Sequence, residues 1–338
     1  MVSIDRRTLL LAAALTSAGI APLAAQGADM EAAKKEGKVI WYTSTPIETA
    51  QRLSNKFQEV SGIKVELFRS GGSAILRRFQ QEGQAGRVLV DVITHSDPAA
   101  ANAMAKKGLF LPFKPSHWEK VPDEAKDPDG NWVAQRLNLM TIYLRTDKVA
   151  AADRPKAWSD LVDPKYKGAM VTTDPSFASL QVAVVGMLAK RLGWEYLEKL
   201  RKNDIMVVQG NQQVSEMLKR GERTIAVGAS DNYAFDDKKA GLAVETVYPT
   251  DGTFVVPSPT SVVKNSPNPN AAKAFAEFML SDTAQRMFPE DGNFAARTDM
   301  PAPEGNPSLA KISIMGIDNE YIEKENARIK KRFNEIMQ

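Results

Sequence analysis

The chain beyond residue 28 alternates short apolar runs with segments whose apolar residues recur at helical spacing. Residues 39–42 read as a strand, and Ile47, Leu53 and Phe57 then mark one face of a helix that ends at Gly62. Because strands that alternate with helices form parallel sheets with right-handed crossovers, the pattern predicts an α/β fold. The strands predicted in this way span residues 39–42, 63–68, 88–94, 169–172, 205–208 and 224–228.

Two further apolar segments predict that the chain folds into two lobes. Residues 137–144 are apolar enough to form a strand that crosses from the first lobe to the second, and residues 255–257 have the character of a return crossing. We therefore expect two doubly wound α/β lobes joined by a two-strand hinge. The expected N-terminal lobe comprises residues 29–136 and 257–300, and the expected C-terminal lobe comprises residues 137–256 and 301–338.

Residues 1–28 have the layout of an export signal. Arg6 and Arg7 precede an uncharged apolar run over residues 9–23, and small residues follow this run. The arginine pair resembles a twin-arginine signal, and a general secretory signal fits nearly as well. The apolar run is shorter than the ~20 residues that a membrane-spanning helix needs. We therefore expect a soluble protein that is exported to the periplasm.

Composition narrows the function classes. The chain has 44 basic and 41 acidic residues and no basic run with interleaved aromatic residues, so nucleic acid is not an expected partner. It has no cysteine, which excludes a disulfide framework and a lipid-anchored cysteine. The two histidines, His95 and His117, lack metal-site spacing, and no nucleophile elbow or Walker loop occurs. We expect a monomeric binding protein without cofactor, metal or enzymatic activity; the alternative of another class is an exported hydrolase that uses His95 and Ser96.

Polar loops follow six of the predicted strands, and five of these loops lead into a predicted helix. Free N–H groups at a helix N-terminus, the positive end of the helix dipole and nearby hydroxyls form a site for carboxylate, phosphate or phosphonate. Ser, Thr and Gly are also ordinary caps and turn residues, so only the coincidence over successive loops favours a site. Ligands of such sheets bind at the carboxyl ends of the strands, which here face the cleft between the lobes. The candidate ligand-binding residues in these loops are Ser44, Thr45, Ser70, Gly72, Ser73, His95, Ser96, Ser176, Asn211, Asp231 and Tyr233.

Four segments, in order and at the usual spacing, resemble the type II periplasmic binding proteins of ATP-driven importers. They span residues 41–67, 90–93, 156–170 and 268–285. Within that class the chain resembles the group that includes the ferric-iron-binding proteins. The resemblance implies that the two lobes close on one ligand and that the closed form delivers this ligand to an inner-membrane ABC permease.

The resemblance also implies that the iron site of this group has been lost. Iron-binding members coordinate the metal with a histidine after the first strand, a glutamate after the third and two adjacent tyrosines in the second lobe. The matching positions here are Pro46, Ser96, Tyr233 and Ala234, so only one of the four ligands remains. A ferric ion needs several anionic oxygen ligands, and proline, serine and alanine supply none.

The companion-anion loop of the same group is similar to residues 175–178, which adds Phe177 and Ala178 to the candidate residues. We therefore expect a small organic anion that bears a phosphate, phosphonate or carboxylate group, with ferric iron plus exogenous anions as the alternative. Asp231 would repel an anion unless the ligand also offers a cation or hydroxyls, as a zwitterionic aminophosphonate or a polyol phosphate does. The other reading is that Asp231 caps local backbone.

Overall fold

The computed structural model describes residues 28–337, so the expected export signal lies, apart from Ala28, outside the described residues. The strands are β1 (Lys38–Thr43), β2 (Lys64–Arg69), β3 (Val92–Thr94), β4 (Val133–Arg145), β5 (Met170–Thr173), β6 (Met206–Val208), β7 (Ile225–Ser230), β8 (Val244–Val247), β9 (Thr253–Val262), β10 (Phe294–Ala295) and β11 (Ile314–Met315). They form one connected sheet in the order β2-β1-β3-β9-β4-β7-β5-β6, with β8, β10 and β11 paired off this path.

Helices cover this sheet along the whole chain. They are α1 (Met30–Glu36), α2 (Ile47–Ser61), α3 (Gly72–Gln84), α4 (Pro98–Lys106), α5 (Ser179–Leu192), α6 (Trp194–Lys202), α7 (Asn211–Arg220), α8 (Asp231–Lys239), α9 (Pro269–Met279), α10 (Asp282–Glu290) and α11 (Asn319–Met337). Within residues 28–337, none of them combines the length and the hydropathy that a membrane crossing requires.

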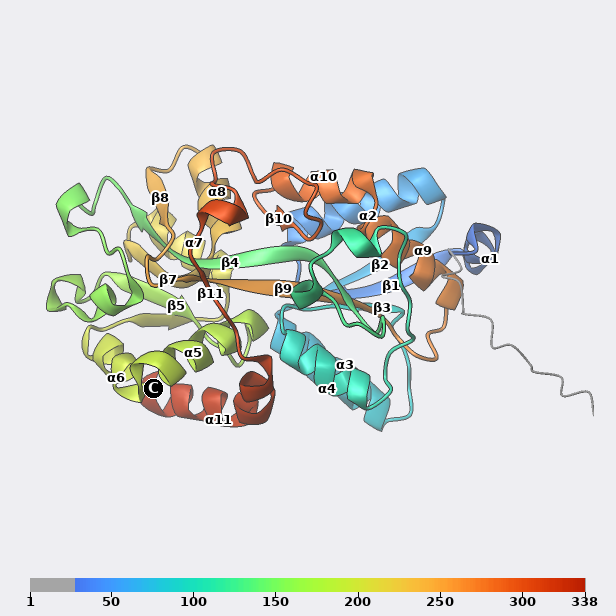
Figure 1. Cartoon of the computed structure of the whole chain (residues 1–338), viewed down its shortest axis with the longest axis horizontal. Coiled ribbons are helices and arrows are strands. Elements are labelled where there is room, and N and C mark those ends of the chain that lie inside the picture. The colour runs from blue at the N-terminus through green and yellow to red at the C-terminus, as the bar shows by residue number, and fades with distance from the viewer. Residues whose placement is uncertain (1–27, 338) are drawn as a thin grey trace, which may run out of the picture.

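The pairing of the strands divides the molecule into two halves. At one end β1 is parallel to β2 and β3, and at the other end β5 is parallel to β6 and β7. Between them, the long strands β4 and β9 are antiparallel to each other and run from one half to the other (Figure 1). The expected architecture of two α/β units joined by two strands is confirmed. We call the part with β1, β2, β3, α2, α3, α4, α9 and α10 the N-terminal half, and the part with β5, β6, β7, α5, α6, α7, α8 and α11 the C-terminal half.

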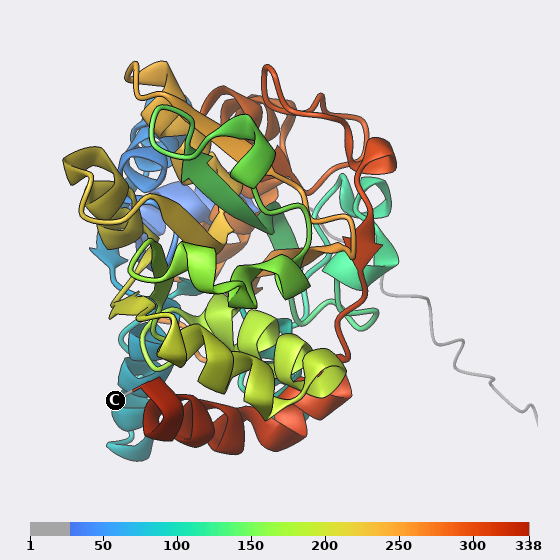
Figure 2. The same cartoon turned by 90° about the vertical axis from the view of Figure 1, so that its left-hand side faces the viewer.

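Each half has its own aromatic core. In the N-terminal half, the ring of Phe275 lies 5.0 Å from the rings of both Trp41 and Phe57 in edge-to-face contacts. In the C-terminal half, Trp158 packs on Phe254, and the terminal helix α11 lies beside α5 and α6 (Figures 1 and 2). Because burial of large aromatic side chains dominates core energetics, each half is stabilised by a core of its own.

Candidate functional site

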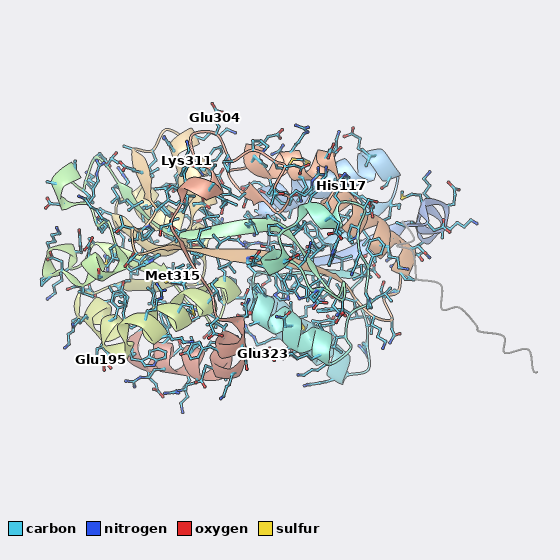
Figure 3. The ribbon with its side chains drawn as sticks, in the orientation of Figure 1. His117, Glu195, Glu304, Lys311, Met315 and Glu323 are labelled. Carbon is cyan, nitrogen blue, oxygen red and sulfur yellow. The ribbon has the colours of Figure 1, made fainter. Side chains whose placement is uncertain are left out.

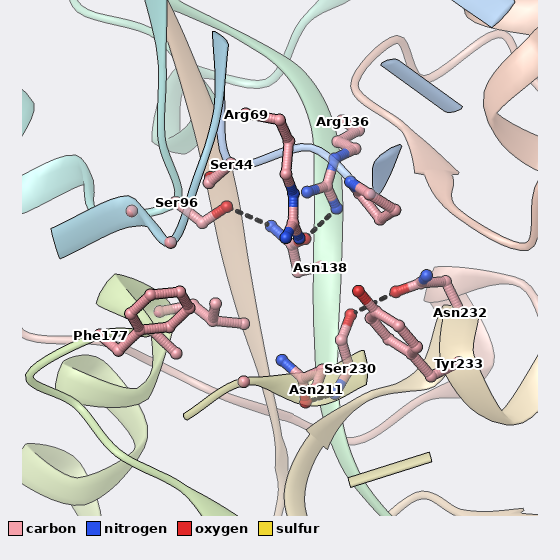
Figure 4. A pocket seen from close by; sticks show the side chains of 16 residues that line it. Ser44, Arg69, Ser96, Arg136, Asn138, Phe177, Asn211, Ser230, Asn232 and Tyr233 are labelled. Carbon is pink, nitrogen blue, oxygen red and sulfur yellow. Dashed lines mark hydrogen bonds between the residues drawn. The ribbon is translucent and has the colours of Figure 1, made fainter. Parts of the chain in front are cut away.

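A cavity of about 50 Å³ lies between the two halves, at the carboxyl ends of the parallel strands (Figure 4). Loops after β1, β2, β3, β5, β6 and β7 contribute to its wall, and β4 closes it from behind. The lining residues are Ser44, Pro46, Arg69, Gly71, Gly72, Ser96, Arg136, Asn138, Phe177, Ala178, Leu180, Gly210, Asn211, Ser230, Asn232 and Tyr233.

Five helices begin at this wall. The N-cap residues of α2, α3, α5, α7 and α8 all line the cavity; they are Pro46, Gly71, Ala178, Gly210 and Ser230. None of these five side chains caps its helix, since proline, glycine and alanine have no side-chain oxygen and Ser230 Oγ donates to Asn232 Oδ1 at 2.7 Å. The positive ends of five helix dipoles favour an anion at this place, and so do first-turn N–H groups that no N-cap side chain satisfies.

Two arginine side chains point into the cavity from the side opposite Asn211 and Ser230 (Figure 4). Arg69 is the last residue of β2, and its Nε donates to the carbonyl oxygen of Thr45 at 3.1 Å. Arg136 lies in β4 and is 3% exposed. Neither guanidinium forms an ion pair with a carboxylate of residues 28–337.

Arg136 is held by amide groups rather than by a counter-charge. Its Nη1 donates to the side-chain oxygens of Asn138 and Asn293, while its Nε has no partner in residues 28–337. Burial, together with the positive charge of Arg69, lowers the pKa of Arg136 to about 10. A buried cation without a counter-charge is unfavourable. An anion bound beside Arg136 would stabilise its protonated, charged form.

A buried polar network fixes the orientation of Asn138. Its Nδ2 donates to Val256 O at 2.7 Å and to Ser258 Oγ at 2.9 Å, and Ser258 Oγ is also 2.8 Å from Ser96 Oγ. These bonds leave the oxygen of Asn138 free to accept from Arg136. On the same wall, Ser44 Oγ is buried and has no hydrogen-bond partner in the described chain, which leaves it as a donor for a ligand.

Hydrogen bonds between the two halves close one side of the cavity. Ser73 N–H donates to Phe177 O at 3.1 Å, and Ser73 Oγ donates to Pro175 O at 3.1 Å. Arg77 Nη1 donates to Ser176 O at 2.8 Å. All three bonds join α3 of the N-terminal half to the loop before α5, so the structure is a closed form.

Two glycines at the start of α3 make this close approach feasible. A Cβ atom built on Gly71 would lie 2.5 Å from the Phe177 ring, and one built on Gly72 would collide with Ser179 Oγ. Neither glycine has a left-handed backbone, so steric clearance across the cleft, not local conformation, requires the absence of a side chain. The Gly71-Gly72 pair thus sets how tightly the halves can close.

The structure brings seven of the thirteen candidate residues to the cavity wall. These are Ser44, Gly72, Ser96, Phe177, Ala178, Asn211 and Tyr233. The other six lie near the wall without lining it. They are Thr45, Ser70, Ser73, His95, Ser176 and Asp231.

Three of those six have a clear structural setting. Thr45 Oγ1 accepts a hydrogen bond from Gln135 Nε2 at 2.7 Å. The carbonyl oxygen of Thr45 accepts from Arg69 Nε, so Thr45 contacts a wall residue without lining the cavity itself. His95 is fully buried, neither ring nitrogen has a partner in residues 28–337, and burial lowers its pKa to about 3. Burial raises the pKa of Asp231 to about 8, which favours the neutral carboxyl group and weakens its repulsion of an anion.

Sequence reasoning missed Arg69, Arg136 and Asn138 as wall residues. Arg69 ends a predicted strand immediately before a Ser-Gly-Gly-Ser loop, which is where ligands of parallel sheets bind. Arg136 and Asn138 flank the start of the apolar run that predicts a crossing strand. Arginine is almost never fully buried unless it is paired. The position of Arg136 next to an apolar strand was therefore the signal that could have identified it as a site residue.

The wall does not suit a metal ion. Within residues 28–337 there is no group of three or more histidine, cysteine, aspartate or glutamate side chains that could hold one. Tyr233 is the one phenol on the wall, and burial raises its pKa although Arg69 and Arg136 lower it. A neutral phenol beside two guanidinium groups is a poor environment for a ferric ion.

Two curated relatives are similar to this chain over most of its length. It is 27% identical over 313 residues to Iron uptake protein A2 of Synechocystis, an alignment that covers 86% of this chain and 85% of that protein. It is 22% identical over 275 residues to the putative 2-aminoethylphosphonate-binding periplasmic protein of Salmonella typhimurium, covering 78% of each.

A solved structure and a family match agree with these relatives. The periplasmic binding protein AfuA from Actinobacillus pleuropneumoniae, solved with exogenous fructose-6-phosphate bound, superposes with a TM-score of 0.80 at 20% identity, covering 89% of this chain and 98% of that one. This likeness confirms the type II periplasmic binding protein fold. Residues 88–325 match the family described as bacterial extracellular solute-binding protein. Since this match spans well over half of the sequence, the chain belongs to that family of solute-binding components of ABC importers.

Proposed function

We propose that this binding protein captures a small organic anion, bearing a phosphate, phosphonate or carboxylate group, in the periplasm and delivers it to an inner-membrane ABC permease. One observation carries the proposal. The cavity between the halves is lined by two arginines and by five helix N-termini whose N-cap side chains do not cap them, and its sixteen lining residues include no aspartate or glutamate. Such a wall stabilises negative charge from several directions.

The energies of these groups are sufficient for tight binding. Hydrogen bonds to charged groups contribute roughly 1.5–3 kcal/mol each. Arg69, Arg136, Ser44 Oγ and the helix N–H groups offer more than four donors, and four or five such bonds supply the ~8 kcal/mol of micromolar affinity after ordering costs. The ligand would touch both halves, and a ligand shifts the equilibrium towards closure only through its preference for the closed form.

Ferric iron with exogenous anions is the weaker reading. The relatives include both an iron uptake protein and a putative phosphonate-binding protein. Sequence similarity therefore does not discriminate between ferric iron and an organic anion as the ligand. The charge of the wall favours the anion, because Tyr233 is the single ferric-type ligand on it and two guanidinium groups oppose a cation.

A hydrolase finds less support. His95, the expected general base of such an enzyme, is buried away from the wall, and Ser96 Oγ is bonded to Ser258 Oγ rather than to a base. We therefore propose binding without turnover, in keeping with the transport role of the relatives.

Titration calorimetry with a panel of phosphonates, sugar phosphates and carboxylates, combined with product analysis, tests this proposal. We expect at least one organic anion to bind with one site per chain and to be recovered unchanged. Release of inorganic phosphate at catalytic rates, abolished in His95→Ala, would instead establish an enzyme. Binding of ferric iron alone, with no anion of the panel bound, would restore the iron reading.

A further inference from the structure

A second cavity adjoins the arginine-lined one. It has a volume of about 420 Å³, and Pro46 and Tyr233 line both cavities. Its remaining wall comes from the start of α2 in the N-terminal half, from α7 and α8 in the C-terminal half, and from Asp291 at the end of α10. The two cavities are therefore adjacent at Pro46 and Tyr233.

The second cavity has the opposite charge. Five carboxylates line it, against a single lysine, Lys219; the carboxylates are Glu48, Glu216, Asp236, Asp237 and Asp291. Three of them form ion pairs with basic side chains: Asp237 with Lys219, Asp291 with Arg52, and Glu216 with Arg220. Glu48 and Asp236 form no ion pair within residues 28–337. We call this space the acidic cavity.

One buried carboxylate oxygen of the acidic cavity lacks a donor. Asp237 is fully buried, and its Oδ1 accepts from Ser215 Oγ at 2.7 Å and from Lys219 Nζ at 2.8 Å. Its Oδ2 has no hydrogen-bond partner in the described chain. Buried carboxylate oxygens are rarely left unsatisfied because the penalty is large, so this atom indicates a missing donor.

The two unpaired carboxylates come from opposite halves. Glu48 lies in the first turn of α2 and Asp236 lies in α8, and both are exposed residues that line the same cavity. Burial raises the pKa of Asp236 to about 6, and the negative charges of Glu48 and Asp237 raise it as well. Their like charges repel each other and favour a cation bound in this cavity.

Charged residues near both cavities change the pKa of Tyr233. Arg69 and Arg136 lower the pKa of its hydroxyl, whereas Asp236 and Glu48 raise it, and burial is the largest influence. The phenol therefore lies between a cationic wall and an acidic wall.

We infer that the acidic cavity binds an ammonium group of the same ligand whose anionic group binds at Arg69 and Arg136, so that the transported solute is a small zwitterion. The inference rests on the proposed function. An ammonium group has three donors, and the carboxylates of Glu48 and Asp236, which form no ion pair within residues 28–337, are acceptors for them in this cavity. A metal ion fits less well, since residues 28–337 offer no cluster of three ligands arranged to hold one. The sequence suggested Asp231 as the acidic group that would face a cationic part of the ligand. We assign this role instead to Glu48 and Asp236, which line the acidic cavity.

Two pairs of probes that differ only in the ammonium group test the inference. They are 2-aminoethylphosphonate against propylphosphonate, and 3-aminopropanoate against butanoate, in which methyl replaces ammonium. Titration calorimetry of the wild-type protein should show at least tenfold tighter binding of the ammonium member of one pair. In the Glu48→Gln, Asp236→Asn double variant the ratio should fall to about one, while the methyl member binds as before.

The matched control is Glu195→Gln, which removes an exposed carboxylate on α6 at the outer surface of the C-terminal half (Figure 3) and should keep the wild-type ratio. Equal binding of both members of each pair would overturn the inference and leave the anion site intact, as would binding of sugar phosphates alone. If no anion of any kind bound, the proposed function itself would fail. The two failures are therefore distinguishable.

Discussion

Arg69 at the end of β2 and Arg136 in β4 face the same cavity from adjacent positions, and neither is paired with a carboxylate of residues 28–337. Two like charges in a partly desolvated space repel each other more strongly than they would in water. The side-chain oxygens of Asn138 and Asn293 accept hydrogen bonds from Arg136 and stabilise its charge in this arrangement. An anion between the two guanidinium groups removes the repulsion, which is the physical basis of the proposed function.

The first prediction concerns these two arginines. Arg69→Gln and Arg136→Gln should each weaken binding of the anionic ligand by about 1.5–3 kcal/mol, or about ten- to 150-fold, because each removes a charge-assisted hydrogen bond. Calorimetry at fixed ionic strength measures this change. Arg87→Gln, at an exposed position of the N-terminal half, is the control and should bind as the parent does. Parent-like affinity in both cavity variants would place the ligand elsewhere.

The second prediction concerns closure. Gly72→Ala should fold normally but close incompletely, because its Cβ meets Ser179 Oγ across the cleft. Since overpacking of this kind costs about 1–3 kcal/mol, affinity should drop about tenfold, and small-angle X-ray scattering should give a larger radius of gyration with ligand present. Gly83→Ala in the same helix is the matched control, as its Cβ meets no atom of the described chain within 4 Å. Identical scattering of the two liganded variants would speak against the steric account.

A third prediction follows from His95. Burial lowers its pKa from 6.5 to about 3, so between these values the unfolded chain binds the proton and the folded chain does not. Acidification through this window therefore reduces the free energy of unfolding, by at most about 1.4 kcal/mol per pH unit from this one group. Denaturant titrations of the wild type and His95→Leu from pH 7 to 4 should show a shallower loss in the variant. Parallel pH profiles would mean that His95 is not buried as described.

Asp231 should behave with the opposite sign. Its pKa is raised by burial from 3.8 to about 8, so the folded form holds a proton that the unfolded form releases. The stabilisation it provides is complete below pH 3.8 and is lost as the pH rises towards 8, by at most about 1.4 kcal/mol per unit. Asp231→Asn should gain stability relative to the wild type as the pH rises from 5 to 8. An unchanged difference between the two proteins over this range would contradict a buried, neutral carboxyl group.

The hydrophobic pattern was sufficient to predict the architecture, because strands and helices that bury one face leave a periodic trace. It predicted α2, for example, from apolar residues at helical spacing and from the left-handed Gly62 that ends it. The return crossing predicted over residues 255–257 is part of a longer strand, β9, whose full length is hidden in the sequence by Pro257 and Pro259, since prolines lack the N–H group that a strand donates. The predicted strand 88–94 is shortened to Val92–Thr94, because the side chain of Asp91 takes the N–H of Ile40 at 2.7 Å.

The site was predictable to the extent that it consists of loops. Positions that follow strands and start helices are visible in the sequence, which is why Gly72, Asn211 and Tyr233 were candidates. The direction of a side chain is not visible, so Ser73 was expected to hold the ligand, whereas in the structure its hydroxyl bonds to Pro175 O across the cleft. The charge of the wall comes from Arg69 and Arg136, which tertiary packing brings together from two separate strands.

A native mass spectrum of the protein, freshly purified from its own host without a chelator or anion exchange, tests the central claim most directly. The account predicts one non-covalent adduct per chain that, on denaturation, is released as a small organic acid bearing a phosphate, phosphonate or carboxylate group. An adduct with the mass of iron and no accompanying organic acid would contradict it.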